Sequence, residues 1–512
     1  MKSRNAAVGK GVMFVVSMIL STQGALCLTD EEIFRDFRFN FINPGARSLG
    51  LGGAFIAAAD DATAAQANPA ALNYITRNEF FAEYRLVQPD APKEFSSSGV
   101  SSDSSGNALD LTLTSVTKEE DTSDPTFLSF AIPFPIGSQK ARMAFSRQVV
   151  LNVQNSLSDP DQGLSTALSL SSSDYPDVPD PVTGDPVPYF VQNKSEGTLD
   201  TEILHYNLGF SISIGEDFSV GLTANYATLD MHAFVSSEVI DPRGVIGFAN
   251  PRDPDGDGTS SPISSESVID DSDSGLGYTV GVHWHPDAVF PSQSGQSPLR
   301  FGFVYRRGAE LSVPEQVTSS SAGSVGTVEE FENVVREPDR FGLGVSWAIG
   351  DHWVLALDGE RIEYSDLLEG FRSGVNFLTS DSFRNSSAVA LAPNNDSPEF
   401  AVDDANVVHA GAEFVLNNIR GSGVKLALSG GFFNAPDNRI RLEKFNSNNA
   451  EIRHLYEDAF RGGGDTNHYT AGTFVSFPLG GFNSMVIQAA GDFSDRGTEF
   501  VLSTLLRFGK AR

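Results

Sequence analysis

Three aspartates at alternate positions of one polar stretch are the residues best arranged to bind a metal ion. Asp253, Asp255 and Asp257 are followed by Gly258, as in the first half of a calcium loop, where alternate carboxylates surround the ion. The twelfth position of such a loop supplies a bidentate glutamate, but it is Ser264 here. We therefore expect a solvated acidic loop with weak calcium binding at most, and no other cofactor.

Two histidines, His283 and His285, form a second group that could bind a metal. They share one face of a strand, but the sequence shows no third ligand for them, so we expect them to line the interior of the fold. The sequence contains no Gly-x-Ser-x-Gly elbow, no His-Glu-x-x-His motif and no phosphate-binding glycine loop. We therefore predict that the protein is not an enzyme.

The charge of the chain excludes one class of partner. The formal net charge is -31 at pH 7, whereas phosphate binding requires clustered Lys and Arg, so we expect no nucleic-acid partner. The mean hydropathy of -0.15 resembles that of a soluble protein. A membrane β-barrel can have the same value, because its strands alternate apolar with polar residues.

The pattern that dominates the chain from about residue 79 onward has a period of two. In residues 210–226, apolar side chains such as Phe210 and Ile212 alternate with serine, glycine and threonine, so one face is apolar and the other polar. We count fourteen such strands, an even number, as single-chain bacterial barrels require. Their centres lie near residues 83, 131, 146, 208, 223, 281, 303, 344, 357, 411, 428, 472, 489 and 503.

The connections between these strands alternate in length. In an up-and-down barrel every second connection lies at the same rim, so the pattern predicts that the long, acidic loops all face the cell exterior. Only the hairpin at 494–498 is short on the long side. A soluble β-sandwich, the alternative, predicts neither this alternation nor uncharged outer faces. The long connections are residues 88–125, 151–200, 234–275, 309–338, 363–404 and 434–466.

The polar faces of the strands carry charged residues, which we expect to point into the lumen. One strand departs from this rule, because Arg147 shares the apolar face of Met143 and Phe145. Either Arg147 extends to the outer membrane interface, or a bulge or kink in this third strand redirects it. The predicted lumen residues are Glu83, Arg85, His205, Arg300, Arg306, Asp358, Glu360, Glu413, Lys425, Asp492 and Arg507.

The first residues have the features of a cleaved secretory signal peptide. Lys2, Arg4 and Lys10 precede an apolar run over residues 12–20. This run is shorter than the roughly 20 residues that a membrane-spanning helix needs. We predict cleavage near Cys27, the single cysteine, so the mature chain has no disulfide within it.

Residues 43–72 form a segment rich in glycine and alanine between the signal peptide and the first strand. The segment contains Gly-Ala-Arg-Ser-Leu-Gly at 45–50, Asp-Asp-Ala at 60–62 and Asn-Pro-Ala at 68–70. Together these motifs resemble the N-terminal region of the FadL/TodX-like family of outer-membrane transporters of long-chain fatty acids and other hydrophobic compounds. The segment suits an interior plug, because its glycines allow close backbone packing.

The resemblance implies an all-β fold: a transmembrane up-and-down antiparallel β-barrel of about fourteen strands with an N-terminal plug, or hatch. It also implies that the third strand is kinked and opens a lateral exit, which would explain the position of Arg147. The plug residues that it implies are Asn43, Pro44, Gly45, Gly50, Gly52, Gly53, Asp60, Asp61, Asn68, Pro69 and Ala70.

We therefore expect a passive transporter of hydrophobic compounds such as long-chain fatty acids, located in a Gram-negative-type outer membrane. Its expected partners are a hydrophobic small-molecule substrate, outer-membrane lipid and lipopolysaccharide. Two alternatives are a protein-secretion shuttle or assembly barrel of the same superfamily, with a protein partner, and a channel for polar solutes. The predicted domains are a signal peptide at 1–27, a plug at 28–78 and a barrel at 79–509 with long extracellular loops.

Overall fold

A computed structural model describes most of the chain from residue 39 to residue 511. The predicted signal peptide and the three aspartates at 253, 255 and 257 lie outside the described residues. The described part excludes residues 1–38, 90–92, 103–107, 120–121, 138, 158–165, 171–177, 180–185, 188, 241–262, 287–297, 321–326, 370–398, 445–456, 458–459, 461, 481, 496 and 512.

Fourteen antiparallel strands close into a barrel, in which β23 pairs with β1 from Asn78↔Phe508 to Pro89↔Gly497. Each predicted strand centre falls within one of these strands, so the predicted antiparallel barrel of about fourteen strands is confirmed. The strands are β1 (Asn78–Pro89), β4 (Thr122–Ile136), β5 (Gln139–Leu157), β9 (Tyr189–Ile214), β10 (Phe218–Ile240), β11 (Ile263–Trp284), β12 (Leu299–Arg307), β15 (Asp339–Ile349), β16 (Trp353–Glu363), β18 (Ala405–Leu416), β19 (Lys425–Ala435), β21 (Thr466–Phe477), β22 (Ser484–Ser494) and β23 (Gly497–Phe508).

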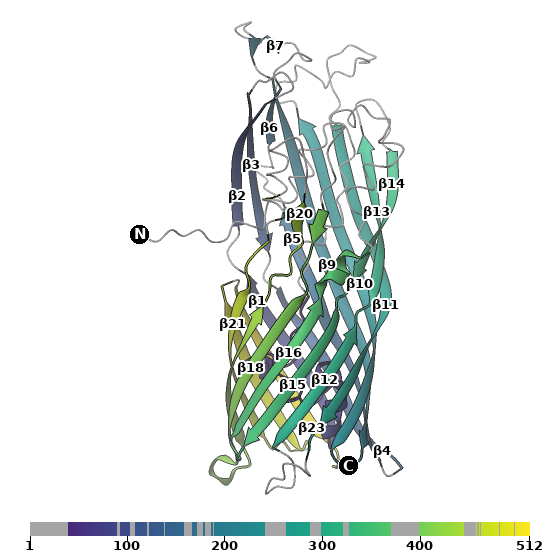
Figure 1. Cartoon of the computed structure of the whole chain (residues 1–512), viewed down its shortest axis with the longest axis vertical. Helices are drawn as coiled ribbons and strands as arrows, with labels where there is room; N and C mark the ends of the chain where they lie inside the picture. The colour runs from purple at the N-terminus through teal and green to yellow at the C-terminus, as the bar shows by residue number, and fades with distance from the viewer. Residues whose placement is uncertain are drawn as a thin grey trace, which may run out of the picture.

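Further strands lie inside the connections that we expected to be loops. Five of them join the main sheet and lengthen the wall beyond one end of the barrel (Figure 1). They are β2 (Lys93–Ser102), β3 (Ala108–Glu119), β6 (Thr166–Leu170), β13 (Glu310–Ser320) and β14 (Thr327–Arg336). Two small pairs are separate from that sheet: β7 (Val178–Pro179) with β8 (Pro186–Val187), and β17 (Glu399–Ala401) with β20 (Arg441–Lys444).

The two rims of the barrel differ in the way that the loop lengths predict. Long connections meet at one end, here called the long-connection rim, and tight turns meet at the other, the short-turn rim (Figure 1). Gly215 and Gly350 lie in two of the tight turns with φ of 72° and 59°, a conformation that favours glycine.

The outer surface is apolar over the part of each strand nearest the short-turn rim. In β10, Leu222 and Tyr226 are 52% and 46% exposed, whereas Thr223 and Asn225 between them are buried and face inward. The outward belt therefore consists of apolar side chains that a membrane could cover. None of the described helices is long and apolar enough to cross a membrane.

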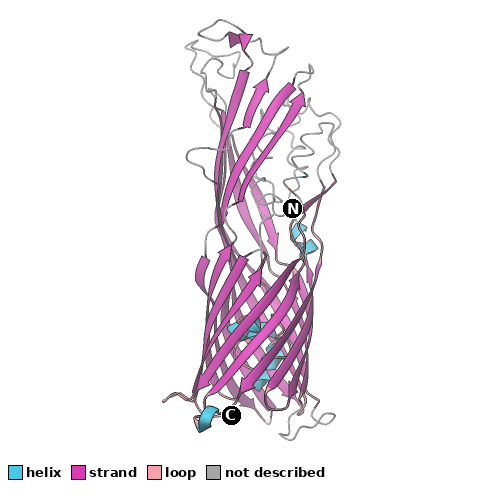
Figure 2. Ribbon diagram, turned by 90° about the vertical axis from the view of Figure 1, so that its left-hand side faces the viewer, coloured by secondary structure: helices cyan, strands magenta, loops and turns pink. Residues whose placement is uncertain are grey.

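The described N-terminal segment, residues 39–77, enters the barrel and carries three short helices. These are α3 (Ala46–Gly50), α4 (Ala64–Ala67) and the 3₁₀ helix η1 (Pro69–Tyr74), which the strands enclose (Figure 2). Wall glycines let the segment approach closely, since a Cβ on Gly221 would lie 2.3 Å from the backbone nitrogen of Ala70. Two further 3₁₀ helices, η2 (Tyr364–Leu368) and η4 (Ile419–Gly421), lie between barrel strands.

Candidate functional site

Arg47 joins the N-terminal segment to the barrel wall by ion pairs. Its Nε and Nη2 lie 2.9 and 3.0 Å from the two carboxylate oxygens of Glu413 on β18, and its Nη1 lies 2.7 Å from Asp60. The Glu413 side chain is only 1% exposed. A bidentate arginine–carboxylate pair of this kind fixes both distance and orientation. The family motif contains Arg47, but the set of predicted plug residues omitted it.

Asn68 and Asp61 stabilise the second half of the motif through hydrogen bonds. Asn68 Oδ1 accepts from the backbone N–H of Ala70 at 3.1 Å, which caps the start of η1. The Asn68 amide also donates to the carbonyls of Ile56 and Val282, both at 3.1 Å. Asp61 accepts from the backbone N–H of Thr63 at 3.0 Å. Asn68 therefore connects a local turn, a distant part of the segment and the wall.

The glycines of the motif serve its turns and its contacts with the wall. Gly45, Gly52 and Gly53 have φ of 104°, 66° and 80°, where other residues are strained. The N–H of Gly45 donates to the carboxylate of Glu83 on β1. Asn43 donates to the carbonyl of Gly53 at 3.3 Å. Pro44, Gly50, Pro69 and Ala70 are likewise buried inside the barrel.

Polar side chains from many strands bind the backbone of the segment. We name this zone of the interior, nearest the short-turn rim, the polar floor. It also includes Glu413 and Asp358, and the Asp358 carboxylate accepts a hydrogen bond from the N–H of Ile56 at 2.7 Å. Its side-chain contacts are His409 Nδ1 with Gly52 O (2.8 Å), His283 Nε2 with Ala57 O (3.2 Å), Ser129 Oγ with Ala62 O (2.8 Å), Thr223 Oγ1 with Ala65 O (3.1 Å), Arg306 Nη2 with Ala67 O (2.6 Å) and Ser219 Oγ with Ala70 O (2.9 Å).

Beyond the polar floor, toward the long-connection rim, the interior becomes apolar. We name this zone the apolar collar; its side chains are buried and form one connected cluster. The collar consists of Val150, Leu151, Leu199, Ile203, Leu229, Met231, Ile269, Leu311, Val313, Val335, Ile362, Leu367, Val402, Val407, Ile440 and Phe460.

A change in the phase of the strand pattern marks the collar in the sequence. Along β10 the outward residues are apolar up to Tyr226, but from Leu229 onward the apolar side chains point inward, while Asp230 and His232 are exposed. Polar side chains outside and apolar ones inside are the pattern of a wall that faces water. This inversion is the sequence signal that we missed.

The first described residues of the chain lie in the collar. Phe39 belongs to the cluster and stacks on Phe41 at 5.2 Å between ring centroids. Phe41 packs against Tyr364, and the guanidinium of Arg340 lies 4.1 Å from the centre of its ring. The chain's own aromatic side chains thus occupy part of the apolar interior.

The third barrel strand, β5, is irregular next to the collar. Its register with β9 shifts between Val149 and Leu151, so Val150 is an extra residue, and the carbonyl of Val150 accepts from the N–H of Asn40 at 2.7 Å. Arg147 stays on the outward face, donates to the carbonyl of Pro125 at 2.9 Å and is partly exposed. The bulge is therefore present, but it lies beyond Arg147 and does not turn it inward.

Most of the predicted lumen residues are buried inside the barrel. Glu83, Arg85, His205, Arg306, Asp358, Glu360, Glu413 and Asp492 are buried, and Arg300 and Arg507 are partly so. Lys425 is different, because it lies at the end of β19 nearest the short-turn rim and is exposed. The pattern assigned its face correctly but could not show how far the enclosed lumen extends.

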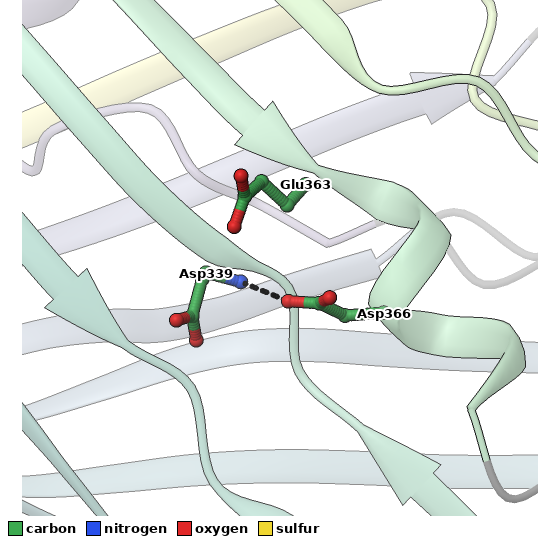
Figure 3. A group of neighbouring side chains, drawn as sticks. All are labelled: Asp339, Glu363 and Asp366. Atoms are coloured by element: carbon green, nitrogen blue, oxygen red, sulfur yellow. Dashed lines mark hydrogen bonds between the residues drawn. The ribbon is translucent and has the colours of Figure 1, made fainter.

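One acidic group could hold a metal among the described residues. Asp339, Glu363 and Asp366 bring carboxylate oxygens within 4.8 Å of one another (Figure 3). Arg307 lies 3.0 Å from Asp339, and Arg361 lies 3.8 Å from Glu363, so arginines already offset part of this charge. Burial, together with the charges of neighbouring carboxylates, raises the pKa of Asp366.

Comparison with known proteins finds solved structures that resemble this fold. No family model matches, and no curated protein matches. The crystal structure of a Pseudomonas aeruginosa FadL homologue matches with a TM-score of 0.51 and 13% identity over 90% of this chain and 96% of that one. The Ralstonia pickettii toluene transporter TbuX gives 0.48 and 17% over 92% and 100%. The chain therefore has the fold of the Pseudomonas FadL homologue.

Proposed function

We propose that the protein is an outer-membrane transporter through which hydrophobic compounds move passively. The observation that carries the proposal is the apolar collar, an apolar interior enclosed by a wall whose outside is polar. Burial of apolar surface drives a hydrophobic molecule from water into such a zone. The resemblance of residues 43–72 to FadL/TodX-like proteins and the shared barrel fold support the same function.

The outward belt supports a location in the outer membrane. Aliphatic and aromatic side chains such as Leu208, Leu222 and Leu343, 55%, 52% and 64% exposed, point away from the barrel. A closed barrel leaves no unpaired strand edge, so it can span a bilayer. The collar then lies just outside the membrane, since the outward residues at its level are polar. We infer that residues 1–27 direct export and are removed.

In this proposal the N-terminal segment is the plug. It fills the lower interior, and the polar floor binds it from many strands, so the polar side chains of the lumen hold protein backbone. A substrate would reach the collar from the long-connection rim and leave sideways at the bulge of β5, where the collar borders the outward apolar belt. Deleting Val150 should restore a regular strand and reduce uptake while the barrel still folds. Unchanged uptake would contradict the lateral exit.

Uptake by liposomes that contain the purified protein tests the function. We expect Leu229→Asn in the collar to slow entry of an uncharged hydrophobic fluorophore about tenfold, because the variant loses one apolar contact with the fluorophore. Thr228→Asn, one residue away and facing outward, is the matched control. Equal rates for both variants and for protein-free liposomes would contradict the transporter.

The same preparation separates the alternatives. A channel for polar solutes would conduct ions in a planar bilayer, whereas a plugged transporter would not. A secretion shuttle would copurify with a stoichiometric protein partner, whereas a transporter would copurify with small apolar molecules.

A further inference from the structure

Two buried arginines border the apolar collar. Arg306 and Arg340 project inward from β12 and β15, with side chains 4% and 8% exposed. A buried arginine is the natural partner of a carboxylate, so a fatty-acid anion in the collar would need one of them.

Arg306 is already engaged by the protein itself. Its Nη1 lies 3.3 Å from Glu360, and its Nη2 donates to the carbonyls of Gln66 and Ala67 and to Asn43. Only Nε has no hydrogen-bond partner. An uncharged acceptor could satisfy that N–H, whereas Glu360 already supplies the negative charge.

Arg340 shares the same carboxylate. It lies 3.6 Å from Glu360, donates to the carbonyl of Phe41 at 3.3 Å and stacks on the Phe41 ring. If the aromatic segment moved to admit a substrate, Arg340 would still face Glu360.

The other buried ionisable groups at this level are acidic or already paired. Glu337 lies 2.7 Å from His205, and Glu315, two residues after the collar residue Val313, accepts from Ser267 at 2.6 Å. The buried ionisable side chains named here are two arginines, one histidine and three carboxylates. Asp339, which directly precedes Arg340, is a further buried carboxylate and pairs with Arg307. This set has no surplus of positive charge to offset the desolvation of a substrate carboxylate.

The negative charge of the long connections also disfavours an anionic substrate. The six connections predicted from the sequence carry 45 acidic and 13 basic side chains, and the acidic ones include the buried Glu315 and Glu337. They join strands that end at the long-connection rim, where an anion would have to approach. Like charge lowers the local concentration of an anionic solute within about a Debye length, roughly 8 Å at physiological salt.

We propose that the collar accepts uncharged apolar molecules and excludes fatty-acid anions. This inference rests on the proposed function and specifies its substrate class. It replaces the long-chain fatty acids that we expected from the family resemblance with neutral compounds of hydrocarbon or ester type.

Competition binding at pH 8 tests the inference with one matched pair of ligands. Decanoate and methyl decanoate have the same alkyl chain, and only the acid is charged. We expect the ester to displace a bound uncharged fluorophore from the purified protein at a concentration at least about tenfold lower. Equal or better displacement by decanoate would overturn the inference and leave the transporter intact. If the fluorophore does not bind at all, the proposed function fails, and the inference fails with it.

Glu360→Gln supplies the second test, because it removes the negative charge that both arginines share. We expect decanoate to bind about tenfold more tightly to this variant, with methyl decanoate unchanged. Glu363→Gln, three residues along β16 and on its outward face, is the control. If Glu360→Gln does not fold, Glu337→Gln makes the same change in charge near the collar. Decanoate affinity that is unchanged in a folded variant would contradict the role of charge.

Discussion

The polar floor and the apolar collar are built on the same strands, yet the floor binds the N-terminal segment through hydrogen bonds and the collar makes apolar contacts. In β10, Ser219 and Thr223 bind the carbonyls of Ala70 and Ala65, whereas Leu229 and Met231, a few residues further on, are buried among apolar neighbours. Hydrogen bonds hold the N-terminal segment in one position, because each has a fixed direction. Apolar contact has no preferred direction, so under the proposed function the collar accepts molecules of different shape.

This difference explains why the specific sequence motif belongs to the floor. The residues of the motif must meet particular wall atoms, so their types are restricted. The collar needs only apolar side chains of suitable size. We expect substitutions in the floor to affect plug position and stability, and substitutions in the collar to affect ligand binding.

The largest effect is expected for Arg47→Met. The variant leaves Glu413 buried without its partner, which costs about 3–5 kcal/mol for a buried pair. We expect a lower midpoint of thermal unfolding in detergent and release of the segment, detected as ion leak in a planar bilayer. The double variant Arg47→Met/Glu413→Leu should recover much of the loss. If Arg47→Met is as stable as the wild type and leaks no more ions, the floor does not hold the segment.

Gly221→Val tests the close fit between wall and segment. The new Cβ would meet the backbone of Pro69 and Ala70, and overpacking costs about 1–3 kcal/mol. We expect increased ion leak with the barrel still folded. Gly359→Val is the control, because a Cβ there meets nothing within 4 Å. Equal leak in both variants would argue against contact at η1.

Phe41→Ala tests the collar separately from the floor. Removing this ring frees apolar space, so we expect an uncharged fluorophore to bind about tenfold more tightly, about 1.4 kcal/mol. Ion leak should stay at the wild-type value, because the floor is intact. Weaker binding would mean that Phe41 contacts the ligand and does not compete with it.

The smallest effect is expected for Asn68→Ala. Loss of a capping side chain costs about 0.5–2 kcal/mol. Hydrogen exchange should become faster at Ala70 and its neighbours, with unchanged exchange in the barrel strands. If exchange at Ala70 does not change, the cap does not stabilise η1.

The sequence predicted the barrel well, because apolar side chains outside and polar ones inside give each strand a period of two. It did not predict β13 and β14, since polar residues such as Glu315 and Asn333 interrupt their apolar face. The motif identified residues such as Asn68, but Arg47 acquires its role only when Glu413 comes near from β18. The collar was missed because its strands invert the pattern, so that the inward side chains of β10 change from polar ones such as Thr223 to apolar ones such as Leu229.

The most direct test of the central claim is the crystal structure of the protein soaked with an uncharged brominated alkane. Anomalous scattering locates bromine independently of the model of the protein. Apolar binding inside the barrel predicts a bromine peak among Leu229, Leu311 and Ile362, with residues 43–72 still seated on the polar floor. Bromine found only on the outward belt would contradict transport through the collar.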